Sequence, residues 1–323
     1  MRFVVYGAGG VGGVVGARLA QHGYHVALIA RGQHYEAIRA DGLTLESPDE
    51  ALRITLPVFN HPSQLSWSNE DIVLLTMKSQ DTAAAIETLP SVAAAATPIL
   101  CVQNGVANER IALRQFANVY GVFVYCATSH LAPGVVRAWH GPTTGILDVG
   151  RYPTGVDRHA EAAAEAFRHA TFYSEARPDI MRWKYRKLLM NLGNAVEALI
   201  GPLERGNQIV AAAKQEGMRC LEAAGHAFAS NDEEPVQRER TLPLRSIGSD
   251  VRQGGSTWQS LARHSSTTEA DYLNGEIVWL GRMHGVPTPV NEGLQKLIRQ
   301  AAAAGAPPAS MTLDQLTALI YQS

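Results

Sequence analysis

The sequence has little of the chemistry that marks secreted, metal-binding or nucleic-acid-binding proteins. Only three cysteines occur in 323 residues, and their wide spacing (Cys101, Cys126 and Cys220) fits neither a disulfide framework nor a metal knuckle. The net charge of −2 gives no electrostatic basis for binding nucleic acid or an anionic membrane. None of the scattered histidines forms an H-x-x-x-H pair, so we expect no metal.

The sequence also has no long apolar run, and we expect no leader peptide. No apolar run approaches the ~20 residues that span a bilayer. Gly7 interrupts the first apolar run where the core of a signal peptide would continue. Because the three cysteines are too few and too widely spaced for a disulfide framework, we expect a protein of the reducing cytoplasm. The length of 323 residues, with 46% hydrophobic residues, predicts two globular domains.

The most informative feature that is present is an apolar strand leading directly into a glycine-spaced turn and a helix. The strand at 2–6 is followed by a G-x-G-x-x-G motif and then by a helical pattern to about residue 21. In dinucleotide-binding folds these glycines form the tight turn, admit the pyrophosphate and allow close helix–strand packing. The helix N-terminus supplies unpaired N–H groups. The predicted cofactor-binding residues of this loop are Gly7, Ala8, Gly9, Gly10, Val11 and Gly12.

The residue after the second strand, at 25–29, indicates which dinucleotide is bound. NAD sites place an Asp or Glu roughly 20 residues after the glycines, where it binds the ribose 2′-hydroxyl. This chain has Arg31 at that point and no acid. A guanidinium can hold a 2′-phosphate by two parallel hydrogen bonds, so NADP is predicted. The alternative is a solvated surface arginine.

The pattern of the chain changes near residue 175. Before it, apolar runs alternate with helical patterns, which is typical of a parallel α/β sheet. The runs at 135–139 and 144–149 are expected to extend that sheet as antiparallel strands. Further expected strands lie at 54–59, 71–76, 98–102, 119–124 and 171–174. We therefore predict an N-terminal Rossmann-type domain at 1–175.

Residues 176–323 are predicted to form an all-helical domain. Helical periods dominate there, and the polar stretch 230–239 is expected to be a loop. The expected helices are 179–201, 207–229, 253–263, 267–284, 291–303 and 313–321.

One helix of the second half carries a polar stripe. Lys184, Lys187, Asn191 and Asn194 recur at intervals that place them on one face of a helix over 179–201. An ammonium aimed at a ketone oxygen can stabilise and protonate it during hydride transfer, and asparagines can orient the substrate. Both lysines remain candidates on this argument, and two ordinary surface lysines are the alternative. The opposite polar face, expected to lie in solvent, comprises Arg182, Arg186, Gly193 and Glu197.

Two other groups of residues have functional interpretations. Thr268 is predicted to begin a helix, and Glu269 falls on the same side as Leu273, Leu280 and Met283, so we expect it to point inward. It would then bind a substrate hydroxyl; the alternatives are a helix-dipole role or a structural role shared with Glu276.

Polar residues also follow two of the expected strands. Lys78 comes after the fourth strand and Asn104 after the fifth. The carboxyl ends of strands are where open α/β sheets bind ligands, so both residues are expected near the nicotinamide.

In this order and spacing, the segments resemble the ketopantoate reductase family, the NADPH-dependent 2-dehydropantoate 2-reductases. The resemblance covers nearly the whole chain. Besides the glycine motif and Arg31, it rests on T-x-K at 76–78, Q-N-G at 103–105, K-L-x-x-N at 187–191, T-E-x-D-x-x-N-G at 268–275 and G-x-x-x-P at 285–289.

The resemblance implies a role for each matching residue. Lys187 corresponds to the family's general-acid lysine, Asn191 to its substrate asparagine and Glu269 to the carboxylate that binds a substrate hydroxyl. Ser256 looks like the serine that helps to hold the substrate carboxylate, while Lys78 and Asn104 match residues near nicotinamide and substrate. We take Asn194 as a further substrate-binding candidate. The family also implies a homodimer.

The chain departs from the family pattern at two positions and in one spacing that bear on the substrate. Ala195 stands where the family often has a second asparagine, with Asn194 one place early, and Ser260 stands where the family has an acid. The distance from Ser256 to Glu269 is one residue longer than is usual in the family. The sequence therefore predicts an NADPH-dependent 2-keto acid reductase, with ketopantoate as the first candidate substrate. A same-fold reductase of another small keto acid or an imine, and a non-catalytic NADP-binding sensor, remain the alternatives.

Overall fold

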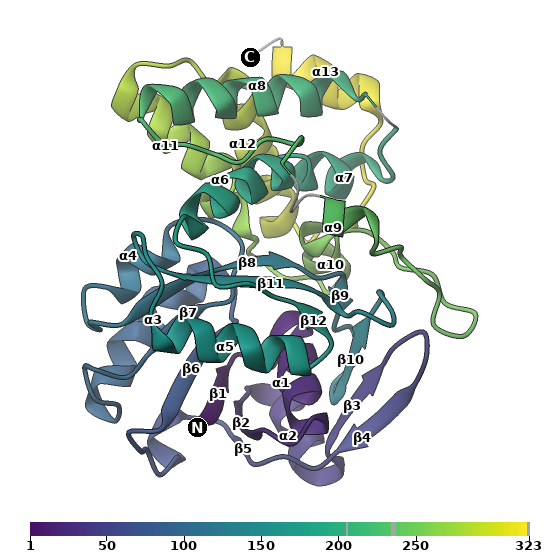
Figure 1. Ribbon diagram of the computed structural model, residues 1–323. Coiled ribbons are helices and arrows are strands. Elements are labelled where there is room, and N and C mark those ends of the chain that lie inside the picture. Colours follow the sequence, from purple (N-terminus) through teal and green to yellow (C-terminus); the bar gives the residue numbers. More distant parts are fainter. Residues whose placement is uncertain (205, 234–236, 322–323) are drawn as a thin grey trace. The chain divides into compact units, whose positions relative to one another are not determined.

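The computed structural model describes residues 1–204, 206–233 and 237–321 (Figure 1). The chain forms two compact units. The first comprises residues 1–104, 108–181 and 231–252, and the second comprises 105–107, 182–230 and 253–323. The sequence predicted a single division after residue 175. In the structure, residues 231–252 belong to the first unit, although the chain on both sides of them belongs to the second.

The first unit is built on a sheet with the strand order β12-β11-β8-β7-β6-β1-β2-β5. At its centre β1 (Arg2–Tyr6) pairs in parallel with β2 (His25–Ile29) and with β6 (Asp71–Leu75). β11 runs antiparallel to β8, as the sequence predicted for that run. The other strands are β5 (Val58–Phe59), β7 (Ile99–Cys101), β8 (Val119–Tyr125), β11 (Gly145–Arg151) and β12 (Phe172–Tyr173).

A smaller sheet has the order β4-β3-β10-β9, and it corrects two predictions. Its strands are β3 (Leu43–Glu46), β4 (Ala51–Ile54), β9 (Thr128–Ser129) and β10 (Val135–Ala138). The expected strand at 54–59 is wrong: β4 and β5 lie in different sheets, separated at Pro57, which has no N–H to continue a ladder. The prediction that 135–139 extends the main sheet is also wrong, because β10 pairs with β3 and β9.

Alternate residues of the parallel strands point to opposite faces of the main sheet. Phe3 and Val5 belong to one buried cluster, which includes residues of α1 (Gly10–Gln21), α2 (Gly32–Asp41) and α5 (Arg158–His169). Val4 belongs to another, which includes residues of α3 (Thr82–Thr88) and α4 (Asn108–Ala112). Helices therefore cover both faces, as in a Rossmann-type layer structure.

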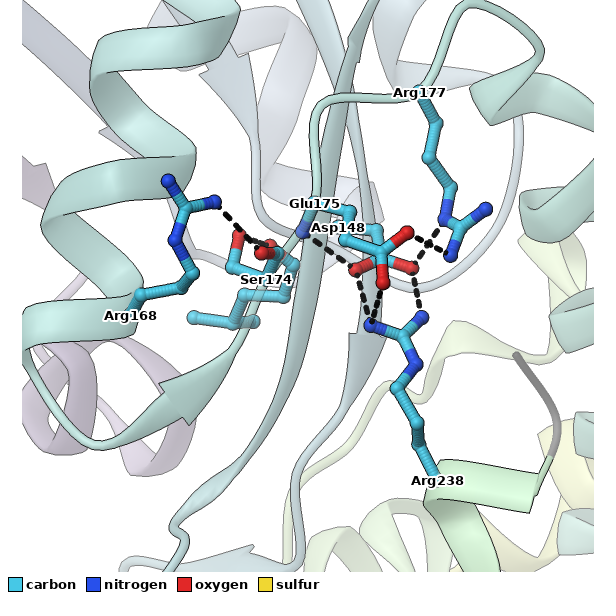
Figure 2. Close-up of polar contacts among 7 residues, drawn as sticks. Asp148, Arg168, Ser174, Glu175, Arg177 and Arg238 are labelled. Atoms are coloured by element: carbon cyan, nitrogen blue, oxygen red, sulfur yellow. Dashed lines mark hydrogen bonds and ion pairs between the residues drawn. The ribbon is translucent and has the colours of Figure 1, made fainter. Parts of the chain in front are cut away.

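The segment 231–252 is fastened to the first unit by ion pairs. Asp148 of β11 is fully buried and accepts hydrogen bonds from Arg177 Nε at 2.6 Å and from Arg238 of α9 (Gln237–Arg240) at 2.5 Å (Figure 2). Outside this buried cluster, Arg245 pairs with Asp49 at 2.6 Å. The sequence predicted a loop over 230–239. In the structure, helix α9 begins near the end of that stretch, and residues 234–236 lie outside the described residues.

The second unit is built from helices. They are α6 (Ile180–Asn191), which begins in the first unit, and α7 (Asn194–Ile200), α8 (Gln208–Ala223), α10 (Ser256–Ala262), α11 (Asn274–His284), α12 (Pro289–Ala303) and α13 (Leu313–Tyr321). The predicted fold class, a Rossmann-type parallel sheet followed by a helical region, is confirmed.

Two helices expected as continuous are interrupted. The helix predicted over 179–201 breaks between α6 and α7, where the buried Asn274 side chain donates to the Leu192 carbonyl at 3.2 Å. The helix predicted over 267–284 divides at Leu273, whose φ of −116° and ψ of −90° are not helical. A short 3-10 helix, Glu269–Tyr272, precedes that break.

Candidate functional site

The glycine-spaced turn between β1 and α1 needs glycine for steric reasons. Gly7 has φ +108°, and a Cβ there would lie 2.7 Å from the Met77 nitrogen. A Cβ on Gly12 would lie 2.3 Å from the Gly7 carbonyl oxygen and from Thr76 Oγ1. At Gly9 the space is open instead, with no heavy atom within 4 Å of the Cβ position. The loop therefore packs tightly against the protein at Gly7 and Gly12 and has unfilled space beside Gly9.

The N-terminus of α1 has no side-chain cap. Its N-cap residue is Gly9, and the first turn contains no acidic residue. The amides of a first helical turn have no partner within the helix, and the helix dipole favours negative charge there. This end of α1, with Gly10, Val11 and Gly12 in its first turn, can accept a phosphate.

Arg31 follows β2 and is the N-cap residue of α2. Its side chain is 73% exposed and pairs with Asp81 at 2.9 Å. Sequence reasoning found no acid after β2; the structure brings one from residue 81, far along the chain, to the guanidinium. An exposed pair of this kind is weak, so the guanidinium can exchange Asp81 for a more highly charged anion.

Lys78 and Asn104 follow the ends of two neighbouring parallel strands, β6 and β7, as the sequence predicted. Asn108 links the two loops, because its amide nitrogen donates to Ser79 Oγ and to the Asn104 carbonyl, each at 3.1 Å. The side-chain oxygen of Asn104 is buried and has no hydrogen-bond partner among the described residues. It can accept a hydrogen bond from a bound ligand.

On α6, Lys187 is half-buried and lies one turn before Asn191, at the helix C-terminus. Asn191 is 5% exposed, and its amide nitrogen has no hydrogen-bond partner in the described part of the chain. Lys184 is more deeply buried, at 2% exposure. Arg186, which the sequence placed on a solvent face, is buried, so that prediction is wrong: α6 has protein around it on more sides than its amphipathic pattern indicated.

The break after Asn191 is held by a buried polar network. Asn274 donates to the Leu192 carbonyl and to Asn291 Oδ1, the latter at 3.0 Å. Asn291 in turn donates to the Glu216 carboxylate at 2.8 Å, and that carboxylate also accepts the Val290 and Asn291 main-chain amides. All three side chains are buried. The network fixes the point where α6 ends and α7 begins, so it determines where Asn191 and Asn194 lie.

Asn194, the first residue of α7, lies close to the start of α10. Gly255 N–H donates to Glu197 Oε2 at 2.8 Å, and a Cβ on Gly255 would lie 3.8 Å from Asn194 Oδ1. Ser256, the first residue of α10, is therefore near Asn194. Ser260, which replaces the family's acid, is buried and donates to the Ser256 carbonyl at 2.9 Å. The two departures, Ala195 and Ser260, are both buried.

Glu269 is buried on the 3-10 helix before α11, which confirms the inward orientation predicted for it. Thr268 caps this helix, as predicted, with its Oγ1 accepting from the Ala270 amide at 3.3 Å. The reasoning by helical phase was wrong in part, because Met283 is 65% exposed. The non-helical Leu273 changes the phase between the two segments.

Two other kinds of site are absent from the described residues. Within residues 1–204, 206–233 and 237–321, no group of three His, Cys, Asp or Glu side chains is placed to hold a metal ion. In the same part of the chain, no helix is both long enough and apolar enough to cross a membrane.

A glycine loop of this geometry at the carboxyl edge of a parallel sheet is characteristic of Rossmann-type dinucleotide-binding proteins. Comparison with known protein families places the chain more specifically within that class. The family model described as "Ketopantoate reductase PanE/ApbA" matches residues 3–153, and its C-terminal counterpart matches residues 179–302. The chain belongs to the ketopantoate reductase family.

Individual relatives cover nearly the whole chain. A 2-dehydropantoate 2-reductase of Halobacterium salinarum is 33% identical, with 94% of this chain and 100% of the relative covered. A PanE/ApbA family ketopantoate reductase from Ralstonia eutropha superposes with a TM-score of 0.78 at 30% identity, covering 94% of this chain and 99% of that one. D-mandelate dehydrogenase in complex with NADH and anilino(oxo)acetate shares the fold, with a TM-score of 0.79 at 22% identity over 94% and 99% of the two chains.

Proposed function

We propose that this chain reduces 2-dehydropantoate (ketopantoate) to pantoate with NADPH. The observation that carries the proposal is the end of α6, where the half-buried Lys187 precedes Asn191, whose buried amide nitrogen has no hydrogen-bond partner among the residues that the structure describes. The family match and the relatives named 2-dehydropantoate 2-reductase support the substrate.

In the proposed reaction, bound NADPH supplies a hydride to the carbonyl carbon of the keto acid. The Lys187 ammonium stabilises the negative charge that develops on the carbonyl oxygen and donates the proton that completes the hydroxyl group. Asn191, Asn194 and Asn104 orient the substrate by hydrogen bonds. The buried Glu269 carboxylate accepts a hydrogen bond from the substrate hydroxyl, and Ser256 donates to the substrate carboxylate.

Arg31 is proposed to select NADP by binding the 2′-phosphate. Its exposed pairing with Asp81 supports this role, because an exposed ion pair is weak and the guanidinium can exchange Asp81 for a phosphate. Residues Gly7 to Gly12 and Lys78 complete the proposed cofactor site. The open space beside Gly9 supports phosphate binding at the loop.

We further propose a homodimer working in the cytoplasm. Trp279 and Met283 lie one turn apart on α11, and both are exposed, at 44% and 65%. Neighbouring exposed apolar side chains are candidates for part of a protein–protein contact surface. Sedimentation equilibrium of the wild type and of Met283→Lys tests this: the wild type is expected to be dimeric, and a monomeric wild type contradicts the proposal. Free cysteines at 101, 126 and 220 suit a reducing compartment.

The test of the main proposal is steady-state oxidation of NADPH with a panel of substrates. The panel contains ketopantoate, phenylglyoxylate, pyruvate and a cyclic imine, and each is also measured with NADH. We expect the highest kcat/KM for ketopantoate with NADPH. Preference for another keto acid or for the imine would assign a different reductase, for which Ala195 and Ser260 mark the divergent positions. Tight NADPH binding without turnover of any compound would indicate a sensor.

A further inference from the structure

His34, on the first turn of α2, bridges two main-chain segments of the first unit. Its Nε2 lies 2.6 Å from the carbonyl oxygen of Ala8, in the middle of the glycine loop. Its Nδ1 lies 2.9 Å from the Gly134 amide nitrogen, just before β10. The ring is partly buried, and its centroid lies 4.0 Å from that of His130. The sequence analysis did not single out this residue.

The two contacts determine which ring nitrogen carries the proton. The Gly134 amide can only donate, so Nδ1 must accept and carries no proton. The Ala8 carbonyl can only accept, so Nε2 carries the proton and donates. One neutral tautomer therefore satisfies both segments at once.

The surroundings of the ring favour this neutral form. Burial, together with the neighbouring His130, lowers the pKa of His34 to about 4. His130 is the titratable group next to the ring, with the two ring planes tilted by 45°, and its own Nδ1 lies 3.1 Å from the Val135 carbonyl oxygen. At neutral pH the bridge is complete; a second proton, on Nδ1, would face the Gly134 N–H and break it.

The Ala8 carbonyl belongs to the peptide group that enters the phosphate-binding turn. At the other end of this peptide group, Gly9 N–H donates to the Gly7 carbonyl at 2.8 Å. Gly7 and Ala8 N–H both donate to the Ile29 carbonyl, at 3.0 and 3.2 Å. His34 thus supplies the only side-chain hydrogen bond found to this peptide group among the described residues. A carbonyl oxygen turned toward the open side of the loop would repel a phosphate.

We propose that His34 is a positioning residue for the dinucleotide: it holds the Ala8 carbonyl on the α2 side of the loop, so that the open side beside Gly9 presents N–H groups to the pyrophosphate. This inference rests on the proposed use of a nicotinamide dinucleotide. His34 itself touches neither the hydride nor the keto acid in the proposed reaction. It therefore acts on cofactor affinity and leaves the chemical step intact.

The experiment compares His34→Ala, His34→Gln and the control His25→Ala, which removes an exposed histidine at the start of β2. The dissociation constants for NADPH and NADP⁺ are measured by fluorescence and calorimetry at pH 7.5. Thermal unfolding without nucleotide shows whether each variant is folded. Loss of one hydrogen bond predicts a dissociation constant about 3- to 10-fold higher for His34→Ala, with kcat at saturating NADPH unchanged. Glutamine, whose amide can donate and accept, is expected to recover part of the affinity.

A pH series adds a measurement that a merely structural side chain would not affect. NADP⁺ affinity of the wild type is expected to fall more steeply between pH 5 and pH 3.5 than that of His34→Gln, because the native His34 ring takes up its proton near pH 4 and glutamine has no titrating ring. Equal affinities of wild type and His34→Ala, or parallel pH profiles of wild type and His34→Gln, overturn the inference.

The outcomes separate this inference from the proposed function. A wild type that binds neither nucleotide overturns both. A wild type that reduces ketopantoate while His34→Ala binds NADPH normally overturns the positioning role alone. A wild type that binds NADPH in a His34-dependent way but turns over no ketopantoate leaves the positioning role and overturns the proposed substrate.

Discussion

The two units present different kinds of chemical group. In the first unit the candidate site is mostly main chain: the amides at the start of α1 and the turn closed by Gly7 and Gly12. In the second unit the candidates are side chains, several of them buried, such as Asn191 and Glu269. Main-chain groups suit an invariant ligand such as a pyrophosphate, whereas side chains can be changed to suit a particular substrate. Variants in the two units should therefore differ in their kinetic effects.

The largest effect is expected from removing the buried carboxylate that fastens segment 231–252. Asp148→Ala removes the buried acceptor that Arg177 and Arg238 share and leaves them paired with the exposed Glu175 (Figure 2). Removing one partner of a buried ion pair costs about 3–5 kcal/mol. Urea unfolding followed by far-UV circular dichroism measures the loss. The control is Asp41→Ala, an exposed acid at the end of α2, which should change little. Equal stabilities of the two variants would show that the cluster does not hold the first unit together.

The next effect is on turnover. Lys187→Ala should lower kcat and kcat/KM together by about 10²- to 10³-fold, by analogy with loss of one oxyanion donor. The dissociation constant for NADPH should stay the same, because the proposed role lies in the chemical step. Lys296→Ala, at an exposed position on α12, is the matched control and should retain full activity.

Lys184→Ala distinguishes the two lysines on α6. Because Lys184 is buried, its loss should lower the thermal midpoint and reduce turnover only a few-fold. If Lys184→Ala is inactive while folded and Lys187→Ala stays active, the general acid lies one turn earlier. Full activity of both variants would exclude a lysine mechanism.

A smaller effect, confined to cofactor selection, is expected at Arg31. Arg31→Ala should raise the KM for NADPH about 10- to 100-fold, because charged hydrogen bonds to the 2′-phosphate contribute about 1.5–3 kcal/mol. The KM for NADH and the kcat with both cofactors should hardly change. Equal losses with NADPH and NADH would mean that Arg31 does not recognise the 2′-phosphate. Arg31 would then not show the cofactor-specific effect expected of a first-unit residue.

The smallest effect is on the pH dependence of stability. Unfolded His34 takes up a proton near its ordinary pKa of 6.5, whereas the native ring stays neutral down to about 4. Between these values the unfolded state binds more protons, so this histidine makes the free energy of unfolding fall as the pH falls. Urea unfolding at pH 7.5, 6 and 5 should show a steeper decline for the wild type than for His34→Gln. Parallel declines would contradict the depressed pKa.

The sequence predicted the start of the first unit well because its signals are local. The strand, turn and helix from Arg2 to Gln21 follow one another directly, and β2 and α1 have the predicted bounds. The small sheet was missed because β3 has only four residues and pairs with β10, some 90 residues away. A short strand whose pairing partner is distant in sequence gives only a weak signal in the local pattern of apolar and polar residues.

Distant contacts also explain what was missed in the candidate site. The break between α6 and α7 depends on Asn274, which is 82 residues from Leu192. Asp81 reaches Arg31 across 50 residues, and His34 reaches Gly134 across 100. Burial of Arg186 likewise depends on packing that the amphipathic pattern of one helix cannot reveal. Motif spacing could identify candidate residues, but not the partners that hold them.

The discontinuous first unit has a consequence for protein synthesis. Ribosomes make the chain from residue 1, and the segment that carries Arg238 belongs to the first unit although it follows residues 182–230 of the second. Asp148 can therefore pair with Arg177 soon after its own synthesis, whereas Arg238 is made only after 90 further residues. Co-translational folding of the first unit can be completed only after residue 252 has left the exit tunnel, when much of the second unit has already been made.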